Sequence, residues 1–295
     1  MVNSFFYNNL SRIMINLQES MALVCDFENW SNYEEELVSN LKKLAKKYEL
    51  NTTLLVPVTR EINTGLWNYE NIKKLADKKN ITNVIFYILN DFTTDDNQEY
   101  LHSNLYEFLN IKKIIVVDNF KIENKIVFSS EFFKKFWNNN CFLIEETIDE
   151  QKNFLRKILL EADFKKIKEK TGLYYKISGR VSEGKKMGRN LGFPTINLLT
   201  PEPILLSEGV YACDVHIKHL AKSYKGAGCY WINELNQKVL EINILDFDKD
   251  IYGWEVEITP ICKLRNNKKV NTIEELKELL KQDVEKVRQI EINIS

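Results

Sequence analysis

The first half of the chain alternates between short apolar runs and longer segments whose apolar residues recur at helical spacing. The apolar runs lie at residues 22–27, 52–58, 83–89, 112–120 and 141–146. The segments with helical spacing lie between them, at residues 34–49, 68–80, 99–110 and 131–140. Continuous apolar strands separated by amphipathic helices are typical of a parallel sheet that is covered on both faces. The pattern therefore predicts a doubly wound α/β domain.

The second half has a different pattern, in which short strands rich in β-branched and aromatic residues are separated by Gly, Asn and Asp turns. These strands are expected at residues 174–181, 209–217, 225–232, 238–247 and 254–264. Five or six strands without helices between them predict an antiparallel sheet that closes into a small barrel. One amphipathic helix, over residues 272–290, is expected to pack against that barrel.

A long helix rich in lysine and glutamate is expected between the two halves, from about Glu150 to Lys170, and Gly172 is placed to end it. We therefore place a domain boundary near residue 172, which gives domains 1–172 and 173–295. Residues 1–20 favour neither a strand nor a free segment.

Composition limits the partners and the compartment. Hydrophobic residues make up 44% of the 295 residues, which is enough for two cores, and the net charge is −1. A near-neutral chain favours small-molecule partners over nucleic acid or a membrane surface. No apolar run reaches the roughly 18 residues of a spanning helix, so the sequence predicts a cytoplasmic chain.

The cysteines and histidines do not form recognisable metal or disulfide patterns. The five cysteines are widely scattered and include no C-x-x-C pair, so we interpret them as buried or free thiols. His216 and His219 form an H-x-x-H pair in a barrel strand or its turn, which we interpret as surface residues.

Residues 179–188 partly match a phosphate-binding loop. Gly179, Gly184 and Lys185 satisfy G-x-x-x-x-G-K, but Lys186 stands where that loop needs Ser or Thr, and the glycines and proline that follow should prevent a helix. Glycines still let main-chain N–H groups converge on an anion, beside basic side chains. The alternative is a solvated basic turn.

Three polar side chains are candidates for catalysis or metal binding. Thr195 and Asn197 are two residues apart at the start of an expected strand, so they share a face and offer neutral oxygens suited to Mg²⁺. Ordinary turn chemistry is the alternative for this pair. Glu241 alternates with apolar residues in a half-buried strand, where a carboxylate is costly unless it is used, so it is the candidate general base.

These motifs together resemble riboflavin kinase. The resemblance rests on G-R-V-x-x-G-x-x-x-G-R-x-L-G-F-P-T-I-N, G-V-Y-A, L-E-I-N-I-L-D-F-D-K-D-I-Y-G and K-L-R, in this order over about residues 173–290. In bacteria this module usually forms the C-terminal half of a bifunctional FAD synthetase, whose N-terminal half is an FMN adenylyltransferase. The resemblance implies a six-stranded barrel behind a nucleotidyltransferase-like, Rossmann-like domain.

The resemblance also implies a reaction, in which the γ-phosphoryl group of ATP passes to the 5′-hydroxyl of riboflavin to give FMN. Thr195 and Asn197 would hold Mg²⁺ and the nucleotide phosphates. Gly184, Lys185 and Gly188 would lie in the loop over the phosphates.

Two further roles follow from the same resemblance. Glu241 would take the proton of the hydroxyl group, and Arg265 with the following segment would help to enclose the flavin.

The N-terminal half departs from the adenylyltransferase pattern, which carries G-x-F-D-G-x-H-x-G-H after its first strand. Here residues 25–34 read CDFENWSNYE, with Ser31 and Glu34 at the histidine positions and Asn29 and Tyr33 at two glycine positions. A glutamate repels phosphate, and a tyrosine fills space that a glycine leaves open. We therefore predict that adenylyl transfer is lost or strongly altered.

Two other adenylyltransferase signatures are weak. Residues 117–125 lack the Phe-Gly ending, and residues 151–156 keep only Arg156. The main hypothesis is thus a riboflavin kinase with a degenerate partner domain. The alternatives are a bifunctional enzyme that makes FAD with other phosphate-binding residues, and a flavin-binding regulatory protein without turnover. The oligomeric state is not predicted.

Overall fold

A computed structural model describes residues 2–8, 17–25, 27, 30–58, 66–89, 97–118, 120, 128–145, 154–183, 187–200, 204–233, 237–292 and 294. The chain forms two compact units, Met1–Phe154 and Leu155–Ser295.

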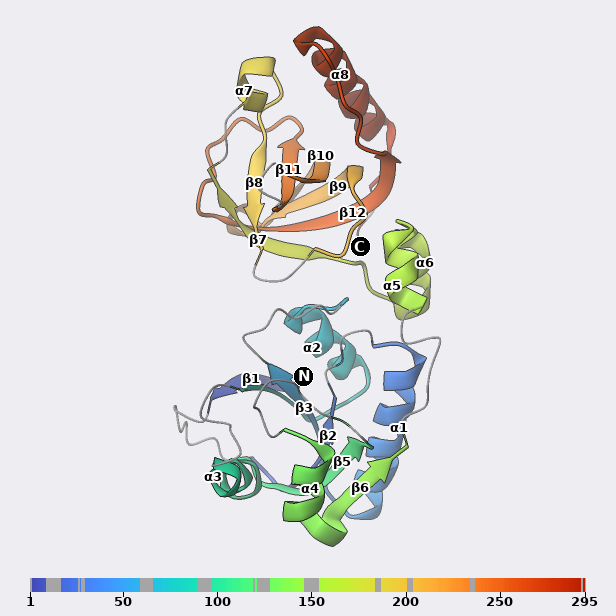
Figure 1. Cartoon of the computed structure of the whole chain (residues 1–295), viewed down its shortest axis with the longest axis vertical. Coiled ribbons are helices and arrows are strands. Elements are labelled where there is room, and N and C mark those ends of the chain that lie inside the picture. The colour runs from blue at the N-terminus through green and yellow to red at the C-terminus, as the bar shows by residue number, and fades with distance from the viewer. Residues whose placement is uncertain are drawn as a thin grey trace. The chain divides into compact units, whose positions relative to one another are not determined.

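The N-terminal unit is built on a six-stranded sheet (Figure 1). Its strands are β1 (Asn3–Asn8), β2 (Ser20–Val24), β3 (Asn51–Val58), β4 (Asn83–Ile88), β5 (Ile111–Val117) and β6 (Cys141–Ile144). They are ordered β1-β4-β3-β2-β5-β6, and all neighbours are parallel. The chain thus extends from β2 toward both edges, which confirms the predicted doubly wound domain. β1, which the pattern did not predict, pairs with β4 at one edge.

Helices cover both faces of this sheet. They are α1 (Asn32–Lys47), α2 (Tyr69–Lys78), α3 (Gln98–Ser103) with a π-helical turn Asn104–Phe108, and α4 (Ser130–Trp137) with a 3₁₀ turn Asn138–Asn140. One face buries Val24, Ile85 and Val116 against aromatic residues of α4 such as Phe133. The alternate strand residues, such as Leu23, are equally buried. Burial on both faces explains the continuous apolar runs.

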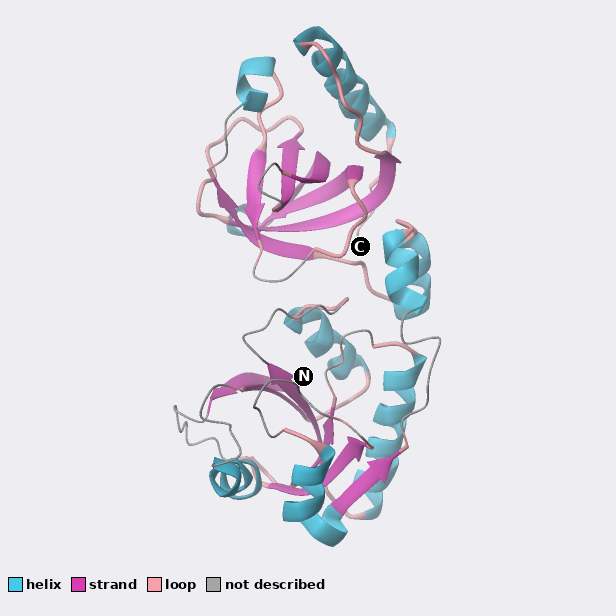
Figure 2. Ribbon diagram, viewed as in Figure 1, coloured by secondary structure: helices cyan, strands magenta, loops and turns pink. Residues whose placement is uncertain are grey.

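The C-terminal unit is a closed six-stranded barrel, as predicted (Figure 2). Its strands are β7 (Ile177–Ser182), β8 (Ile196–Leu199), β9 (Gly209–Ile217), β10 (Lys222–Ile232), β11 (Lys238–Ile244) and β12 (Glu255–Arg265). They close in the order β10-β11-β8-β7-β12-β9, with antiparallel neighbours throughout. Gly226 faces the interior, where an added Cβ would lie 2.7 Å from the Val215 side chain, so this glycine allows the barrel to close tightly.

Helix α8 (Ile273–Gln289) packs beside β9 and β10, which confirms the predicted C-terminal helix (Figure 1). Thr272 caps its first turn by accepting the Glu275 amide at 3.1 Å. Its C-terminal half is anchored to the barrel, because Val287 is fully buried and Lys225 Nζ donates to the Arg288 carbonyl at 2.9 Å.

The predicted long helix before the barrel is two helices, α5 (Phe154–Leu160) and α6 (Phe164–Thr171), so that prediction was wrong. Ala162 has a left-handed backbone with φ 61°, and the Asp163 carboxylate then caps a new helix by accepting the Lys166 amide at 3.1 Å. Gly172 ends α6 with φ 71°, as predicted. The boundary between the two compact units lies directly after Phe154, the first residue of α5. The domain boundary near residue 172 stays a prediction.

The glycine-rich stretch contains a short helix, α7 (Met187–Leu191), where none was predicted. Gly192, with φ 86°, ends this helix, and the Phe193 amide donates back to the Gly188 carbonyl at 2.8 Å. The glycines therefore permit one short helix, although the sequence predicted that they would prevent a helix here.

The cysteines are free thiols as expected, whereas the two histidines differ in exposure, and His216 is half-buried in β9 beside the Ser223 hydroxyl. All five cysteines are free thiols, and Cys25 and Cys213 are buried. His219 is exposed and stacks on Trp254, with ring centroids 4.5 Å apart. None of the helices that the structure describes is long and apolar enough to cross a membrane.

Candidate active site

A row of three polar side chains crosses neighbouring strands of the barrel. Glu241 in β11 is the register partner of Asn197 in β8, and on its other side of Cys229 in β10. Directly paired residues of antiparallel strands hold their Cβ atoms roughly 5 Å apart. The register therefore brings the predicted base next to one of the predicted metal ligands.

This row lies on the outer face of the barrel. Leu240, Ile242 and Ile244 of β11 are buried in the interior, whereas Glu241 and Asn243 between them are half-buried. Because successive side chains of a strand point to opposite faces, Glu241 and Asn243 face outward. A substrate can reach this face without opening the barrel.

Thr195 precedes the first residue of β8, one turn of chain away from helix α7. A Cβ atom added to Gly188 would lie 3.3 Å from the Thr195 hydroxyl oxygen and 2.3 Å from the Phe193 carbonyl oxygen. Gly188 is therefore required for the close approach of α7 to the Phe193–Thr195 segment. The same segment is held from β11, where the Asn243 amide donates to the Pro194 carbonyl at 2.7 Å.

The pKa of the Cys229 thiol reflects burial and the charges near this outer face. Burial raises its pKa to about 11, and the Glu241 carboxylate is the next cause in the same direction, whereas Arg265 opposes them. Glu241 is thus close enough to influence its neighbour by charge. A half-buried carboxylate in such a setting can accept a proton from a bound hydroxyl group.

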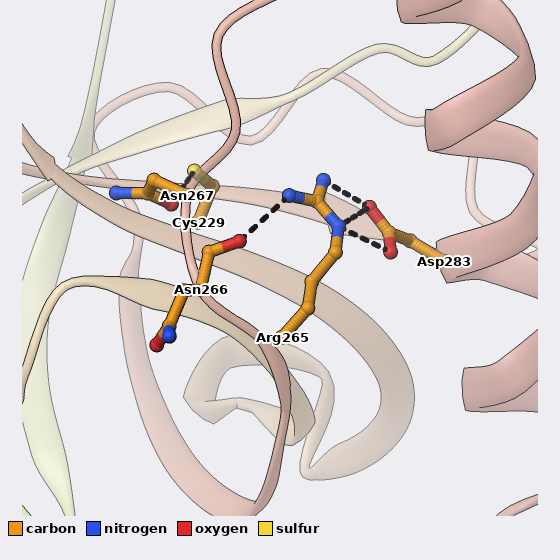
Figure 3. A network of polar contacts seen from close by, with 5 residues as sticks. All are labelled: Cys229, Arg265, Asn266, Asn267 and Asp283. Carbon is orange, nitrogen blue, oxygen red and sulfur yellow. Dashed lines mark hydrogen bonds and ion pairs between the residues drawn. The ribbon is translucent and has the colours of Figure 1, made fainter.

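Arg265, at the end of β12, is part of a polar network with helix α8 (Figure 3). Its Nε and Nη2 atoms donate to the two carboxylate oxygens of Asp283 at 2.9 and 2.6 Å, and Nη1 donates to the Asn266 carbonyl at 3.1 Å. Asn267 in turn donates to the Tyr230 carbonyl at 3.0 Å. The segment after β12 is thereby fastened to both α8 and β10.

The structure brings together Gly188, Thr195, Asn197 and Glu241. Arg265 bonds the Asn266 carbonyl, and the Cys229 thiol donates to the side chain of the next residue, Asn267. Gly184 and Lys185 lie outside the described residues, so their role in the loop over the phosphates stays a prediction.

Sequence reasoning missed Asn267 and Asp283, and it gave Asn243 no role of its own. The alternation of β11 does place Asn243 on the face of Glu241, but its partner lies 49 residues away in the chain. No sequence pattern identifies such a partner.

In the N-terminal unit, two aromatic residues that follow β2 are buried against each other. Phe27 and Trp30 are 0% and 2% exposed, and their ring centroids lie 4.9 Å apart. Trp30 Nε1 donates to the Glu35 carboxylate at 3.0 Å. Phe27 stands at the Phe of the adenylyltransferase pattern, whereas Tyr33, which is 8% exposed, replaces one of its glycines.

The start of α1 is closed by its own carboxylate. The Glu34 side chain accepts from the Ser31 amide at 2.5 Å and from the Ser31 hydroxyl at 2.7 Å, and Glu34 is fully buried. Such a capping box satisfies N–H groups that a helix N-terminus could otherwise offer to a phosphate.

The barrel matches a known family. The sequence model of the flavokinase family, described as riboflavin kinase, matches residues 171–291. The chain is 27% identical to the bifunctional riboflavin kinase/FMN adenylyltransferase of Buchnera aphidicola subsp. Schizaphis graminum, over 95% of this chain and 96% of that relative. The barrel, over residues 171–291, therefore belongs to the riboflavin kinase family. This assignment makes it an ATP-dependent phosphotransferase.

Two other matches are a shorter relative and a solved structure. The chain is 36% identical to the RNA-binding riboflavin kinase RibR of Bacillus subtilis, over 37% of this chain and 47% of that relative. A solved structure described as a macrolide-efflux protein from Streptococcus pneumoniae aligns over 98% of this chain and 100% of its own, with a TM-score of 0.65. At 19% identity, this second likeness shows the fold alone.

Proposed function

We propose that the chain makes FMN from riboflavin and ATP on the outer face of its barrel, and that its N-terminal unit no longer transfers adenylyl groups. The observation that carries the first part is the register Cys229–Glu241–Asn197, with Thr195 beside it. This arrangement supports phosphoryl transfer, which needs mainly positioning and charge stabilisation.

Glu241 serves as the general base in this proposal. The riboflavin 5′-oxygen attacks the γ-phosphorus, the bond from that phosphorus to the bridging oxygen breaks, and ADP leaves. The carboxylate of Glu241 accepts the proton that the 5′-hydroxyl gives up. The half-buried position of Glu241 restricts its contact with water while leaving it accessible from the outer face.

Thr195 and Asn197 fit a Mg²⁺ ion that arrives with the nucleotide. They contribute a hydroxyl and a carboxamide oxygen, which are hard neutral ligands. Among the described residues there is no cluster of three His, Cys, Asp or Glu side chains that could hold a metal by itself. Mg²⁺ bound by two neutral side chains and the phosphates would neutralise phosphate charge during transfer.

Glu241→Gln tests this role, because it removes the base while keeping the shape of the side chain. General-base catalysis contributes about 10²–10⁴-fold, so kcat should fall by this factor while riboflavin still binds. Glu255→Gln is the matched control, since Glu255 is an exposed barrel residue bonded to Lys218. A Glu241→Gln enzyme with near-normal kcat would remove Glu241 from the mechanism.

The proposed loss of adenylyl transfer is supported by Tyr33, which is buried at a glycine position of the pattern, and by the Glu34 cap of α1. A phosphate at this helix would have to displace a buried carboxylate and would be repelled by it. Incubation of the protein with FMN, ATP and Mg²⁺ should therefore give neither FAD nor pyrophosphate. Formation of FAD at the rate of the kinase step would instead establish a bifunctional enzyme, as the names of several relatives describe for those proteins.

A further inference from the structure

Asn243 holds the segment that carries Thr195. It lies in β11, two residues beyond Glu241 and on the same outer face. Its side-chain Nδ2 donates to the Pro194 carbonyl oxygen at 2.7 Å. A carbonyl oxygen can only accept, so the acceptor determines that the NH₂ end of the amide points at Pro194.

This hydrogen bond lies just beyond the end of the backbone pairing between β8 and β11. In the register of β8 and β11, Glu241 pairs with Asn197 and Ile242 with Ile196, and β8 begins at Ile196. Thr195 therefore lies between the ladder on one side and the Asn243–Pro194 bond on the other. The Asn243 side chain thus holds the chain at Pro194, where the backbone pairing between β8 and β11 has ended.

Helix α7 limits the same segment from another side. The Phe193 amide donates to the Gly188 carbonyl at 2.8 Å, and an added Cβ on Gly188 would lie only 3.3 Å from the Thr195 hydroxyl oxygen. The segment is thus held by α7 at Phe193 and by Asn243 at Pro194. Without the Asn243 bond, the Pro194 carbonyl is free to swing, and the Thr195 hydroxyl moves relative to Asn197 and Glu241.

We propose that Asn243 is a positioning residue, which sets the Thr195 hydroxyl relative to Asn197 and so determines how strongly Mg²⁺ supports nucleotide binding. The proposal rests on the proposed kinase function and deepens it. In this proposal Asn243 acts through the Pro194 carbonyl, to which its side chain donates. Misplacement by about 1 Å can cost up to about 10²-fold, so a displaced ligand should have a measurable effect.

Asn243→Leu is the most direct variant, since it keeps the approximate size and neutrality of the side chain and removes the donor. Asn243→His is the rescue variant, because the imidazole Nδ1 lies as many bonds from Cβ as the asparagine Nδ2 and can carry an N–H. Asn51→Leu is the matched control. Asn51 is also half-buried in a strand, and its Nδ2 also donates to a backbone carbonyl, that of Glu19 at 3.4 Å.

The kinetic experiment uses the full-length chain and separates the two substrates. Asn243→Leu should raise the KM for Mg·ATP by about tenfold or more and lower kcat, with the KM for riboflavin within about twofold of wild type. Asn243→His should recover most of the loss, and Asn51→Leu should behave as wild type. Equal rises in both KM values, or no rise in either, would overturn the proposal.

A binding measurement tests the same inference without turnover. Calorimetric titration of ADP with and without Mg²⁺ should show that Mg²⁺ strengthens ADP binding to the wild-type chain, and that Asn243→Leu loses most of this gain. The affinity for metal-free ADP should remain unchanged. An undiminished Mg²⁺ effect in Asn243→Leu would overturn the positioning role. A wild-type protein that forms no FMN would instead contradict the proposed function, and the ADP titration would still test Asn243.

Discussion

Removal of the Asp283 carboxylate should release helix α8 from the barrel. The Asp283 side chain is 3% exposed and the Arg265 side chain 20%, so the carboxylate and guanidinium form a largely buried, two-point ion pair. Breaking a buried pair from one side costs roughly 3–5 kcal/mol, because the remaining charge stays uncompensated. Arg265 keeps its bond to the Asn266 carbonyl, so we take the lower end, about 3 kcal/mol.

This loss is large for α8, because only Asp283 and Val287 of the helix are buried. A loss of about 3 kcal/mol corresponds to roughly a 100-fold change in the opening equilibrium. Hydrogen exchange measured on peptides from residues 273–289 should therefore show protection about 100-fold lower in Asp283→Ala. The N-terminal unit should be unchanged and serves as an internal reference.

Two further variants sharpen this test. Asp246→Ala breaks an ion pair of the same helix with Arg288, in which both side chains are exposed, so it should change protection little. The double variant Arg265→Met with Asp283→Leu replaces the buried pair by apolar side chains and should recover much of the protection. If Asp283→Ala lowers protection by less than about fivefold, the pair does not hold the helix, and our reasoning about it is refuted.

Three other outcomes follow from the site. Glu241→Gln should lower the pKa of the Cys229 thiol, since the Glu241 carboxylate contributes to raising it to about 11; alkylation of Cys229 at pH 9, followed by peptide mass spectrometry, should be faster than in wild type, and an equal rate would contradict the contact. Gly188→Ala should raise the KM for Mg·ATP, because its Cβ would lie 2.3 Å from the Phe193 carbonyl oxygen; unchanged kinetics would mean that α7 shifts freely. Thiols of an unfolded chain have a pKa of about 8.5, whereas that of Cys229 is raised to about 11, so the neutral thiol favours the folded state. Barrel stability should therefore fall as the pH rises from about 8.5 through 11, and it should fall less steeply in Cys229→Ala. A flat profile would contradict the burial of this thiol.

Much of the fold was predictable because its determinants are local and repetitive. Continuous apolar runs such as residues 83–89 indicated buried parallel strands, and the strand pattern after Gly172 indicated the barrel. β1 escaped prediction because its six residues carry no clear period and its partner β4 lies 80 residues later. The break at Ala162 escaped because no glycine or proline marks it.

The candidate site was also predictable only in part. Thr195, Asn197 and Glu241 were recognisable from residue type and alternation, and the register between β8 and β11 places two of them together. The contacts that fix them are long-range, such as Asn243 to Pro194 and Arg265 to Asp283. Which polar side chain meets which carbonyl or carboxylate depends on the closed barrel and on the packing of α8, which no local pattern contains.

The most direct test of the central claim is a time course with purified protein, riboflavin, ATP and Mg²⁺, in which riboflavin, FMN and FAD are separated by chromatography. We expect FMN to accumulate in proportion to the riboflavin consumed, with no FAD at any time. Failure to form FMN would contradict the kinase site around Glu241, and FAD that follows FMN would contradict the proposed loss of adenylyl transfer.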